Sequence, residues 1–238
     1  MSKYRAVFFD AGETLLSPHP SFHEIFSAVL GEHGAPVDAQ EVLGAFDAVA
    51  PNFIEVLGKL GTTTWSTSRE ISRQFWGTVY DTAFSELGIE DGNDALKDAL
   101  YERFTRYESY RLFPDSVPAV EKIRAAGLTV GLISNFEEWL EGMLIHFEVA
   151  PLFDVMVISG KEGVEKPDPE IFRRALERTG VEARDAVYVG DHPTIDVEAA
   201  ESVGMTAILI DRRGRHSGFR GSRIGTLSDL PGLLESLT

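Results

Sequence analysis

Four apolar runs of the sequence each lead into side chains that could take part in catalysis. Three of these side chains are carboxylates. If they meet in space, they would repel one another, which would raise the pKa of at least one of them. A divalent cation with oxygen ligands, for which we expect Mg²⁺, would relieve that repulsion. A lysine and a hydroxyl beside it would suit the oxygens of a phosphoryl group. The residues in question are Asp10, Ser134 with Asn135, Lys166, and Asp191 with Asp196.

The apolar runs themselves predict the strands of a parallel sheet. From Phe113 onward such runs alternate with amphipathic helical stretches, which indicates a doubly wound α/β core covered on both faces. Functional groups gather beyond the carboxyl ends of the strands in such sheets, so we expect the site at that edge. The predicted strands are residues 6–9, 128–133, 154–158, 186–190 and 206–210, and the predicted helices include 117–126, 169–179 and 196–203.

The region between the first two core strands is predicted to be helical. A capping box at residues 21–24 starts one helix, and 38–41 starts a second. Aromatic and aliphatic residues at helical spacing continue beyond them, which is typical of helix packing. We therefore predict an α/β core domain of residues 1–16 and 112–238, and a smaller inserted helical domain of residues 17–111.

Composition narrows the function classes. The 238 residues are 43% hydrophobic and 25% charged, as in an ordinary globular protein. The formal net charge of -16 disfavours nucleic acid as a partner, and no apolar run of membrane-spanning length is present. No cysteine and no secretory signal are visible, so we expect a cytoplasmic location. The oligomeric state stays open, and a monomer is compatible with the sequence.

The chain resembles the haloacid dehalogenase-like (HAD) hydrolase superfamily over nearly its whole length. The segments "FFDAGETL", "LISN", "EKPDPEIF" and "GDHPTID" stand in the order of the family's four motifs. The resemblance implies a Rossmann-like core with a helical cap inserted after the first motif. It also implies a Mg²⁺-dependent phosphohydrolase acting on a small phosphorylated metabolite.

The roles of individual residues follow from this resemblance. Asp10 would be the nucleophile that forms an aspartyl-phosphate, and Lys166 would hold the nucleophile and the phosphate together. Ser134 would hydrogen-bond the phosphoryl group, with Asn135 beside it, and Thr14 would help to fix the loop after the first strand. The resemblance assigns the Mg²⁺ ion to Asp10, the backbone carbonyl of Gly12 and Asp191, with support from Asp196.

Gly12 departs from the pattern of the family's phosphatases. Those phosphatases usually carry the pattern D-x-D-x-T at the first motif, with an Asp at the position of Gly12. That second Asp protonates the leaving oxygen and later activates water. The pattern here is "DAGET". General acid–base catalysis contributes roughly 10²–10⁴ in rate, so the absence of this carboxyl group is significant. It leaves three possibilities open. Another side chain substitutes, the leaving group needs no proton, or the protein is not a phosphatase. The candidate substitutes are Glu13, His19, His23 and His192.

Three other functions are compatible with parts of the sequence. Dehalogenases of the superfamily lack the acidic fourth motif, which this chain keeps in "GDHPTID". Phosphonatases need a lysine of the inserted domain for a Schiff base, and that domain offers Lys59 and Lys97. A weakly active or non-catalytic ligand-binding protein is the alternative from another class. Turnover of an activated phosphate ester with Mg²⁺ would separate it from an enzyme.

Residues 211–223 form an arginine-rich segment in this acidic chain. It carries five arginines and follows a predicted core strand, so its start should lie near the active-site edge. We expect either an exposed surface loop or an arginine that binds a second anionic group on the substrate. The arginines are Arg212, Arg213, Arg215, Arg220 and Arg223.

Overall fold

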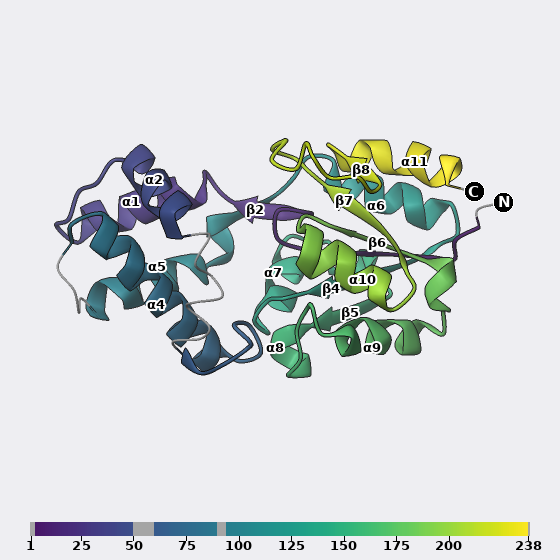
Figure 1. Cartoon of the computed structure of the whole chain (residues 1–238), viewed down its shortest axis with the longest axis horizontal. Helices are drawn as coiled ribbons and strands as arrows, with labels where there is room; N and C mark the ends of the chain where they lie inside the picture. The colour runs from purple at the N-terminus through teal and green to yellow at the C-terminus, as the bar shows by residue number, and fades with distance from the viewer. Residues whose placement is uncertain (1–2, 50–59, 90–93, 238) are drawn as a thin grey trace. The chain divides into compact units, whose positions relative to one another are not determined.

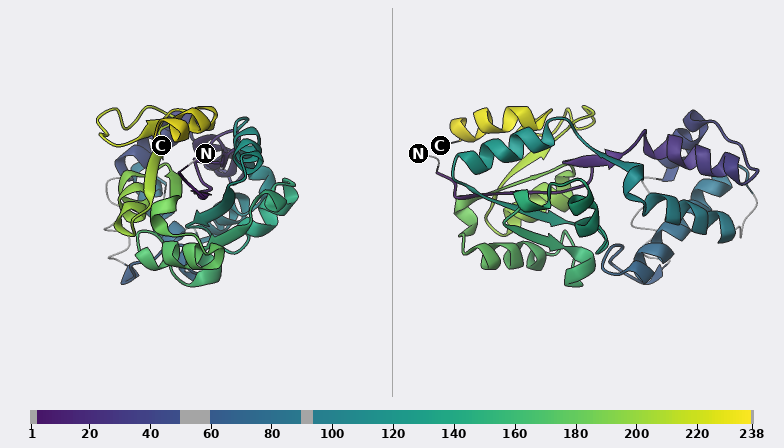
Figure 2. Two further views of the ribbon diagram at one scale, coloured as in Figure 1. Left: turned by 90° about the vertical axis from the view of Figure 1, so that its right-hand side faces the viewer. Right: turned by 180° about the vertical axis from the view of Figure 1, so that it is seen from behind.

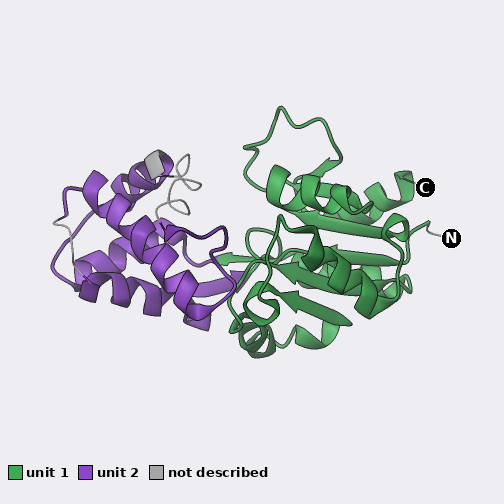
Figure 3. Ribbon diagram, turned by 60° about the horizontal axis from the view of Figure 1, so that its bottom comes forward, with its two compact units in different colours: residues 1–17, 112–238 green, residues 18–111 purple. Residues whose placement is uncertain are grey.

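The computed structural model describes residues 3–49, 60–89 and 94–237 of the chain. The chain forms two compact units, which Figure 3 colours separately. Unit 1 comprises residues 1–17 and 112–238, and unit 2 comprises residues 18–111. Lys59, one of the two lysines considered above, lies outside the described residues.

Unit 1 is built on a six-stranded sheet in the order β5-β4-β1-β6-β7-β8. Each pair of neighbouring strands is parallel, and β1 lies between β4 and β6. The expected doubly wound α/β core is thereby confirmed. The strands are β1 Ala6–Phe9, β4 Thr129–Ser134, β5 Val155–Ile158, β6 Ala186–Gly190, β7 Thr206–Ile210 and β8 Arg223–Ile224.

Helices cover both faces of this sheet (Figures 1 and 2). The helices α6 and α11 contact each other on one face, and α9 and α10 contact each other on the opposite face. Fully buried side chains of β1 and β6 fill the layer under α9 and α10. Because helices cover the other face of the sheet as well, these strands are apolar on both faces. The helices of unit 1 are α6 Ser116–Ala125, α7 Leu140–His146, α8 Ser159–Glu162, α9 Pro169–Thr179, α10 Ala199–Ser202 and α11 Leu230–Ser236.

Short helical turns complete unit 1. A π-helix, Pro193–Glu198, leads directly into α10. The sequence predicted an ordinary helix from residue 196, and the helical backbone begins earlier because Pro193 occupies its first position, where proline is favoured. The 3₁₀ turns are Ala150–Leu152, Ala183–Asp185 and Leu227–Asp229.

Unit 2 is a helical unit with an aromatic core. The side chains of Ser21 and Ser68 cap α1 and α4 by accepting backbone N–H groups. The ring of Phe26 is fully buried and contacts the rings of Phe46 and Tyr80 edge-on. The helices are α1 Phe22–Glu32, α2 Ala39–Val49, α4 Arg69–Glu86 and α5 Asp94–Phe104, followed by a 3₁₀ turn Tyr107–Ser109.

A two-stranded sheet marks where the chain passes from unit 1 to unit 2 and back. It pairs β2, Leu16–Pro18, with β3, Tyr110–Leu112. Both crossings of the chain therefore lie side by side. Among the described residues, the structure has no helix that is both long enough and apolar enough to span a lipid bilayer.

Candidate active site

The carboxyl ends of three strands and the loop after β5 bring the expected polar side chains together in unit 1. Ser134 Oγ donates a hydrogen bond of 3.0 Å to Asp10 Oδ1. Lys166 Nζ lies 2.7 Å from the same Asp10 oxygen and 2.6 Å from Asp196 Oδ1. All four side chains are buried. The Lys166 ammonium group thus bridges Asp10, which follows β1, and Asp196, which follows β6, although the two carboxylates are far apart in the sequence.

Asn135 fixes the loop that carries Lys166. Its side-chain amide donates to the Lys166 carbonyl at 2.8 Å, and its Oδ1 accepts the Lys166 N–H at 2.7 Å. Asp168 then caps α9 by accepting the N–H of Glu170, and Pro169 starts the helix. The amide of Asn135 is therefore engaged in positioning the lysine.

Gly190 allows Asp196 to fold back against the end of β6. A Cβ at Gly190 would lie 2.6 Å from Asp196 Oδ2, so any larger residue would collide with the carboxylate. The backbone N–H of His192 donates to the same oxygen at 2.9 Å. The other oxygen, Oδ1, accepts from Lys166 and Tyr188. Because both oxygens already have protein partners, the geometry favours a supporting role for Asp196.

Tyr188 also belongs to the site, although its place in the apolar segment of β6 indicates only a core residue. Its hydroxyl lies 2.9 Å from Lys166 Nζ, 3.0 Å from Asp196 Oδ1 and 3.0 Å from the Ile133 carbonyl. Lys166 therefore uses all three ammonium hydrogens on Asp10, Asp196 and Tyr188. Burial raises the pKa of Tyr188 well above its usual value, and the charges of Asp196 and Asp10 add to this, so the phenol stays protonated.

Three carboxylates form an acidic cluster at this edge. Ligand oxygens of Asp10, Asp191 and Asp196 lie within 4.8 Å of one another. Burial raises the pKa of Asp191 well above its usual range, and the charges of Asp196 and Asp10 raise it further. The pKa of Asp10 is also raised, by burial first and by the charge of Asp196, against the opposing charge of Lys166. Hard oxygen donors that repel one another fit a divalent cation such as Mg²⁺.

Lys166 supplies the only opposite charge in direct contact with this cluster among the described residues. Burial by itself would lower the pKa of Lys166, but the charges of Asp10 and Asp196 and their hydrogen bonds outweigh it. The net effect is a raised pKa, so the ammonium form is stabilised throughout the physiological range. The Lys166 ammonium group balances only part of the negative charge of the three carboxylates. The negative charge that is left could attract a bound metal cation.

The loop after β1 is a tight turn. Leu15 and Leu16 both donate their N–H groups to the Ala11 carbonyl. Thr14 is fully buried, and its hydroxyl has no hydrogen-bond partner among the described residues. Glu13 has a φ of 51°, in the left-handed region that few side chains adopt. This turn directs the Glu13 carboxylate to Arg213, at 2.8 Å.

The histidine candidates occupy different environments. His192 Nδ1 accepts the N–H groups of Thr194 and Ile195, each at 3.2 Å, and so caps the π-helix. Burial lowers the pKa of His192, which favours the neutral ring. His19 belongs to unit 2, where its backbone N–H donates to the Ser109 carbonyl, and His23 lies on α1.

In the arginine-rich segment, the side chain of Arg212 contacts other parts of unit 1. Arg212 forms two hydrogen bonds to the Asp115 carboxylate, at 2.9 and 3.1 Å, and another of 2.7 Å to the Thr14 carbonyl. Its guanidinium also stacks on Phe113, 3.8 Å from the ring centroid. The guanidinium of Arg212 thus holds the loop after β1 and the start of α6 together. Arg215 and Arg220 are exposed.

Comparison with known proteins identifies the family. The family model of the haloacid dehalogenase-like hydrolases matches residues 4–204. Haloacid dehalogenase-like hydrolase domain-containing protein 3 of Danio rerio is 33% identical over 213 residues, which cover 88% of this chain and 86% of the relative. Phosphoserine phosphatase of Thermus thermophilus is 34% identical over 157 residues, which cover 64% of this chain and 62% of that protein.

A solved structure shares the fold. The magnesium-bound YfnB protein of Bacillus subtilis, described as a HAD-hydrolase, superposes with a TM-score of 0.78 at 16% identity, covering 98% of this chain and 99% of that one. At this level of identity the likeness concerns the fold alone. Together with the family match, it confirms the resemblance that the four motifs indicated. The chain belongs to the haloacid dehalogenase-like hydrolase family.

Proposed function

We propose that the chain is a Mg²⁺-dependent phosphohydrolase that acts on a small phosphorylated metabolite through an aspartyl-phosphate on Asp10. One observation carries the proposal: Lys166 bridges Asp10 and Asp196 at the carboxyl ends of the strands, within a cluster of three carboxylates. This is a set of groups suited to a phosphoryl group and a divalent cation. Phosphatases among the relatives support the same class of reaction.

The side chains of unit 1 would have different roles in such a reaction. Asp10 presents a carboxylate oxygen to phosphorus, and Lys166 orients that carboxylate and offers positive charge to the phosphoryl oxygens. Ser134 donates to Asp10 from the end of β4, and it would donate to a bound phosphoryl group. Asp10, Asp191 and the Gly12 carbonyl would hold Mg²⁺, with Asp196 in support. When bound, that ion would neutralise charge on the carboxylates and on the phosphoryl group.

Replacing the nucleophile tests the proposal. Asp10→Asn keeps the size of the side chain and removes the attacking oxygen, so turnover of 4-nitrophenyl phosphate with Mg²⁺ should fall by at least about 10³-fold. Circular dichroism should show that the variant is folded. Substantial remaining activity in this variant would contradict the assignment of Asp10. Lys166→Ala should also be nearly inactive, because the carboxylates and phosphate would lack its positive charge.

Dehalogenation and a binding-only role are the competing functions. The three-carboxylate cluster argues against dehalogenation, because it would repel an anionic haloacid and because that chemistry needs no cation site. A ligand-binding protein is favoured only by the absence of an acid side chain at Gly12. Lack of turnover of any activated phosphate ester, with retained Mg²⁺-dependent binding of inorganic phosphate, would support the binding role instead.

A further inference from the structure

The arginine-rich segment begins with a fixed turn directly after β7. The N–H of Gly214 donates to the Asp211 carbonyl at 3.2 Å, which closes a turn with Arg212 and Arg213 in its middle. The buried Asp211 carboxylate accepts the N–H of Arg215 at 2.8 Å, and so holds the chain after the turn. The two arginines therefore project from a backbone that hydrogen bonds fix in place.

These two arginines have different surroundings. The Arg212 side chain is only 11% exposed, and it is engaged by Asp115 and by the Thr14 carbonyl. The Arg213 side chain is 49% exposed, and its Nη2 lies 2.8 Å from Glu13 Oε2. Arg213 thus has a carboxylate of the protein as a partner while about half of its side chain still faces solvent. Part of its guanidinium is open to a ligand.

Glu13 places this ion pair beside the acidic cluster. It lies three residues after Asp10, which corresponds to at most about 11 Å of extended backbone, and the tight turn after β1 shortens that distance. Burial and two neighbouring carboxylates raise the pKa of Asp191 most, and the charge of Glu13 adds to this. A small molecule with its phosphoryl group at Asp10 would therefore have Arg213 within its reach.

A second anionic group on a substrate needs positive charge in this region. The chain has a formal net charge of -16, and three carboxylates lie together at this edge of the sheet. A guanidinium binds a carboxylate with parallel N–H donors, and the contact with Glu13 shows that a carboxylate fits beside Arg213. Because a partly exposed ion pair contributes little to stability, Arg213 can exchange Glu13 for another carboxylate at small cost.

Resting on the proposed function, we propose that Arg213 is a specificity-determining residue that binds a carboxylate of the substrate in place of Glu13. The substrate class is then small phosphate monoesters that carry a carboxylate at the other end. Glu13 keeps the guanidinium oriented until such a substrate arrives. Phosphate esters with a neutral group at that end gain no affinity from Arg213.

Pairs of phosphate esters that differ by one carboxylate test the inference. The pairs are 2-phosphoglycolate with 2-hydroxyethyl phosphate, and 3-phosphoglycerate with glycerol 3-phosphate. Calorimetry with the Asp10→Asn variant and Mg²⁺ measures their affinities without turnover. We expect the carboxylate ester of at least one pair to bind more tightly than its neutral partner. Adding Arg213→Ala should weaken its binding about 10–100-fold, and should change the neutral ester by less than about twofold, because salt screens more distant charges.

Two further variants separate this contact from an effect of net charge. Arg215→Ala removes an exposed arginine of the same segment and should change neither affinity. Glu13→Gln keeps the size of the side chain and removes the competing charge, so the carboxylate ester should bind several-fold more tightly. An equal gain for the neutral ester would show only a general relief of repulsion, and would overturn the exchange of partners.

The remaining outcomes distinguish this inference from the proposed function. Equal affinities within both pairs, or a preference that survives Arg213→Ala, would overturn the inference. The proposed function would stand if the parent cleaves 4-nitrophenyl phosphate with Mg²⁺, because that ester has no carboxylate. A preference for propane-1,3-diol bisphosphate over 3-hydroxypropyl phosphate, with none for the carboxylate esters, would assign Arg213 to a second phosphate and overturn the carboxylate class. Selective binding of carboxylate esters by a parent that cleaves no phosphate ester would overturn the proposed function alone.

Discussion

Both units bury aromatic rings, but among the described residues only unit 1 also buries a cluster of charged side chains. In unit 1 the Lys166 ammonium and the Asp10 and Asp196 carboxylates are all buried at one edge of the sheet. In unit 2 the charged pairs stay near the surface, as in the contact of Arg73 with Asp98, whose side chains are about half exposed. Buried charges lose hydration that their pairing only partly restores, while buried rings gain stability from leaving water.

The difference separates residues that serve chemistry from residues that serve folding. The raised pKa of Asp10 and of Asp191 means that unit 1 holds these groups in an environment that disfavours their charge. Carboxyl groups with raised pKa values are typical of functional sites. Unit 2 shows no comparable cluster among its described residues. Substitutions should therefore affect activity and stability differently in the two units, which four variants and their matched controls would test.

The largest expected effect on stability lies in unit 2. Phe26 is fully buried against the rings of Phe46 and Tyr80, so Phe26→Ala should reduce the free energy of unfolding by about 3–5 kcal/mol. Guanidinium unfolding followed by tryptophan fluorescence measures it. Ile145→Ala, at an exposed position in unit 1, is the control and should change stability by less than about 0.5 kcal/mol. Equal effects in both variants would contradict the contrast.

In unit 1, removing one hydroxyl should cost activity more than stability. Tyr188→Phe keeps the buried ring and removes the contacts to Lys166 and Asp196. Because hydrogen bonds to charged groups contribute about 1.5–3 kcal/mol, kcat for 4-nitrophenyl phosphate should fall about tenfold or more. Phe172→Leu alters packing against the same ring, 5.1 Å away, and should lower stability with little change in kcat. An unchanged kcat in Tyr188→Phe would remove Tyr188 from the site.

Arg212 should behave as a structural residue despite its place beside the site. Its two bonds to Asp115 and its stacking on Phe113 are mostly buried, so Arg212→Ala should lower the free energy of unfolding by about 1–3 kcal/mol. The Michaelis constant should stay unchanged. Arg215→Ala, at an exposed position, should leave stability unchanged. A raised Michaelis constant with unchanged stability would instead favour the expectation that an arginine binds the substrate.

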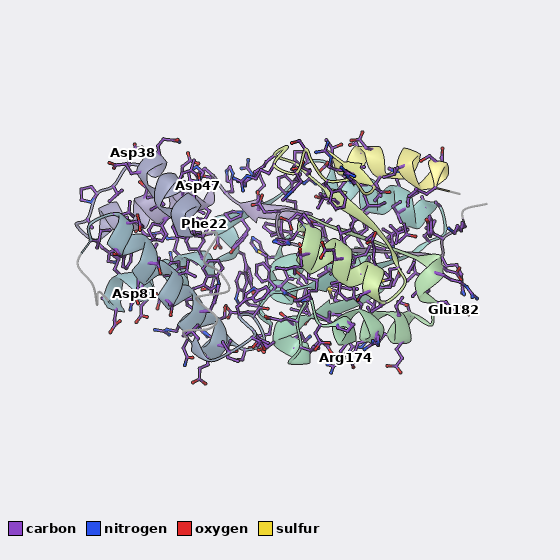
Figure 4. All side chains as sticks on the ribbon, in the orientation of Figure 1. Phe22, Asp38, Asp47, Asp81, Arg174 and Glu182 are labelled. Carbon is purple, nitrogen blue, oxygen red and sulfur yellow. The ribbon has the colours of Figure 1, made fainter. Side chains whose placement is uncertain are left out.

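The smallest effect concerns a partly exposed ion-pair network on α8 and α9, where Figure 4 labels Arg174. Hydrogen bonds from Arg178 and then from Arg174 lower the pKa of Glu162, against the opposing effect of burial. A lowered pKa contributes stability above the ordinary value of about 4.3, and that stability is lost as pH falls through the folded value. Because these side chains are partly exposed, the contribution should stay below about 1 kcal/mol.

The melting temperature as a function of pH measures this contribution. Arg178→Ala should lower it at pH 7 and by less at pH 3, because the contribution of Glu162 is lost as pH falls toward and through its lowered pKa. Arg173→Ala is the control, since Arg173 approaches Glu170 only at 4.0 Å and is 61% exposed. A loss in Arg178→Ala that is equal at both pH values would show that the charge of Glu162 is not its cause.

The sequence predicted the strands that are buried on both faces and the order of the groups after them. The bounds of β1, β6 and β7 agree with the apolar runs, because a fully buried strand needs an unbroken apolar segment. The bounds of α9 agree as well, since Asp168 and Gly180 cap its two ends. That Asp10, Lys166 and Asp196 meet follows from the geometry of a parallel sheet.

Features that depend on tertiary contacts were not predictable in the same way. Tyr188 lies within an apolar run, and nothing in its local sequence shows that its hydroxyl reaches Lys166. Arg212 was one of five similar arginines, and only its position opposite Asp115 in the fold distinguishes it. The strands β2, β3 and β8 are short, with two or three residues each, so they have too few positions for a hydrophobic period.

The paired strands β2 and β3 have a consequence for how the chain folds. All of unit 2 separates β1 from β4 in sequence, yet these strands are neighbours in the sheet. Closing a longer loop costs only about 0.6 kcal/mol for each doubling of its length, but it slows the search for the partner strand. Once unit 2 has folded and β2 has paired with β3, the two ends of the insertion are held together. The remaining connections are then residues 10–15 and residues 113–128, which are much shorter than the whole insertion, so early folding of unit 2 would hasten assembly of the central sheet.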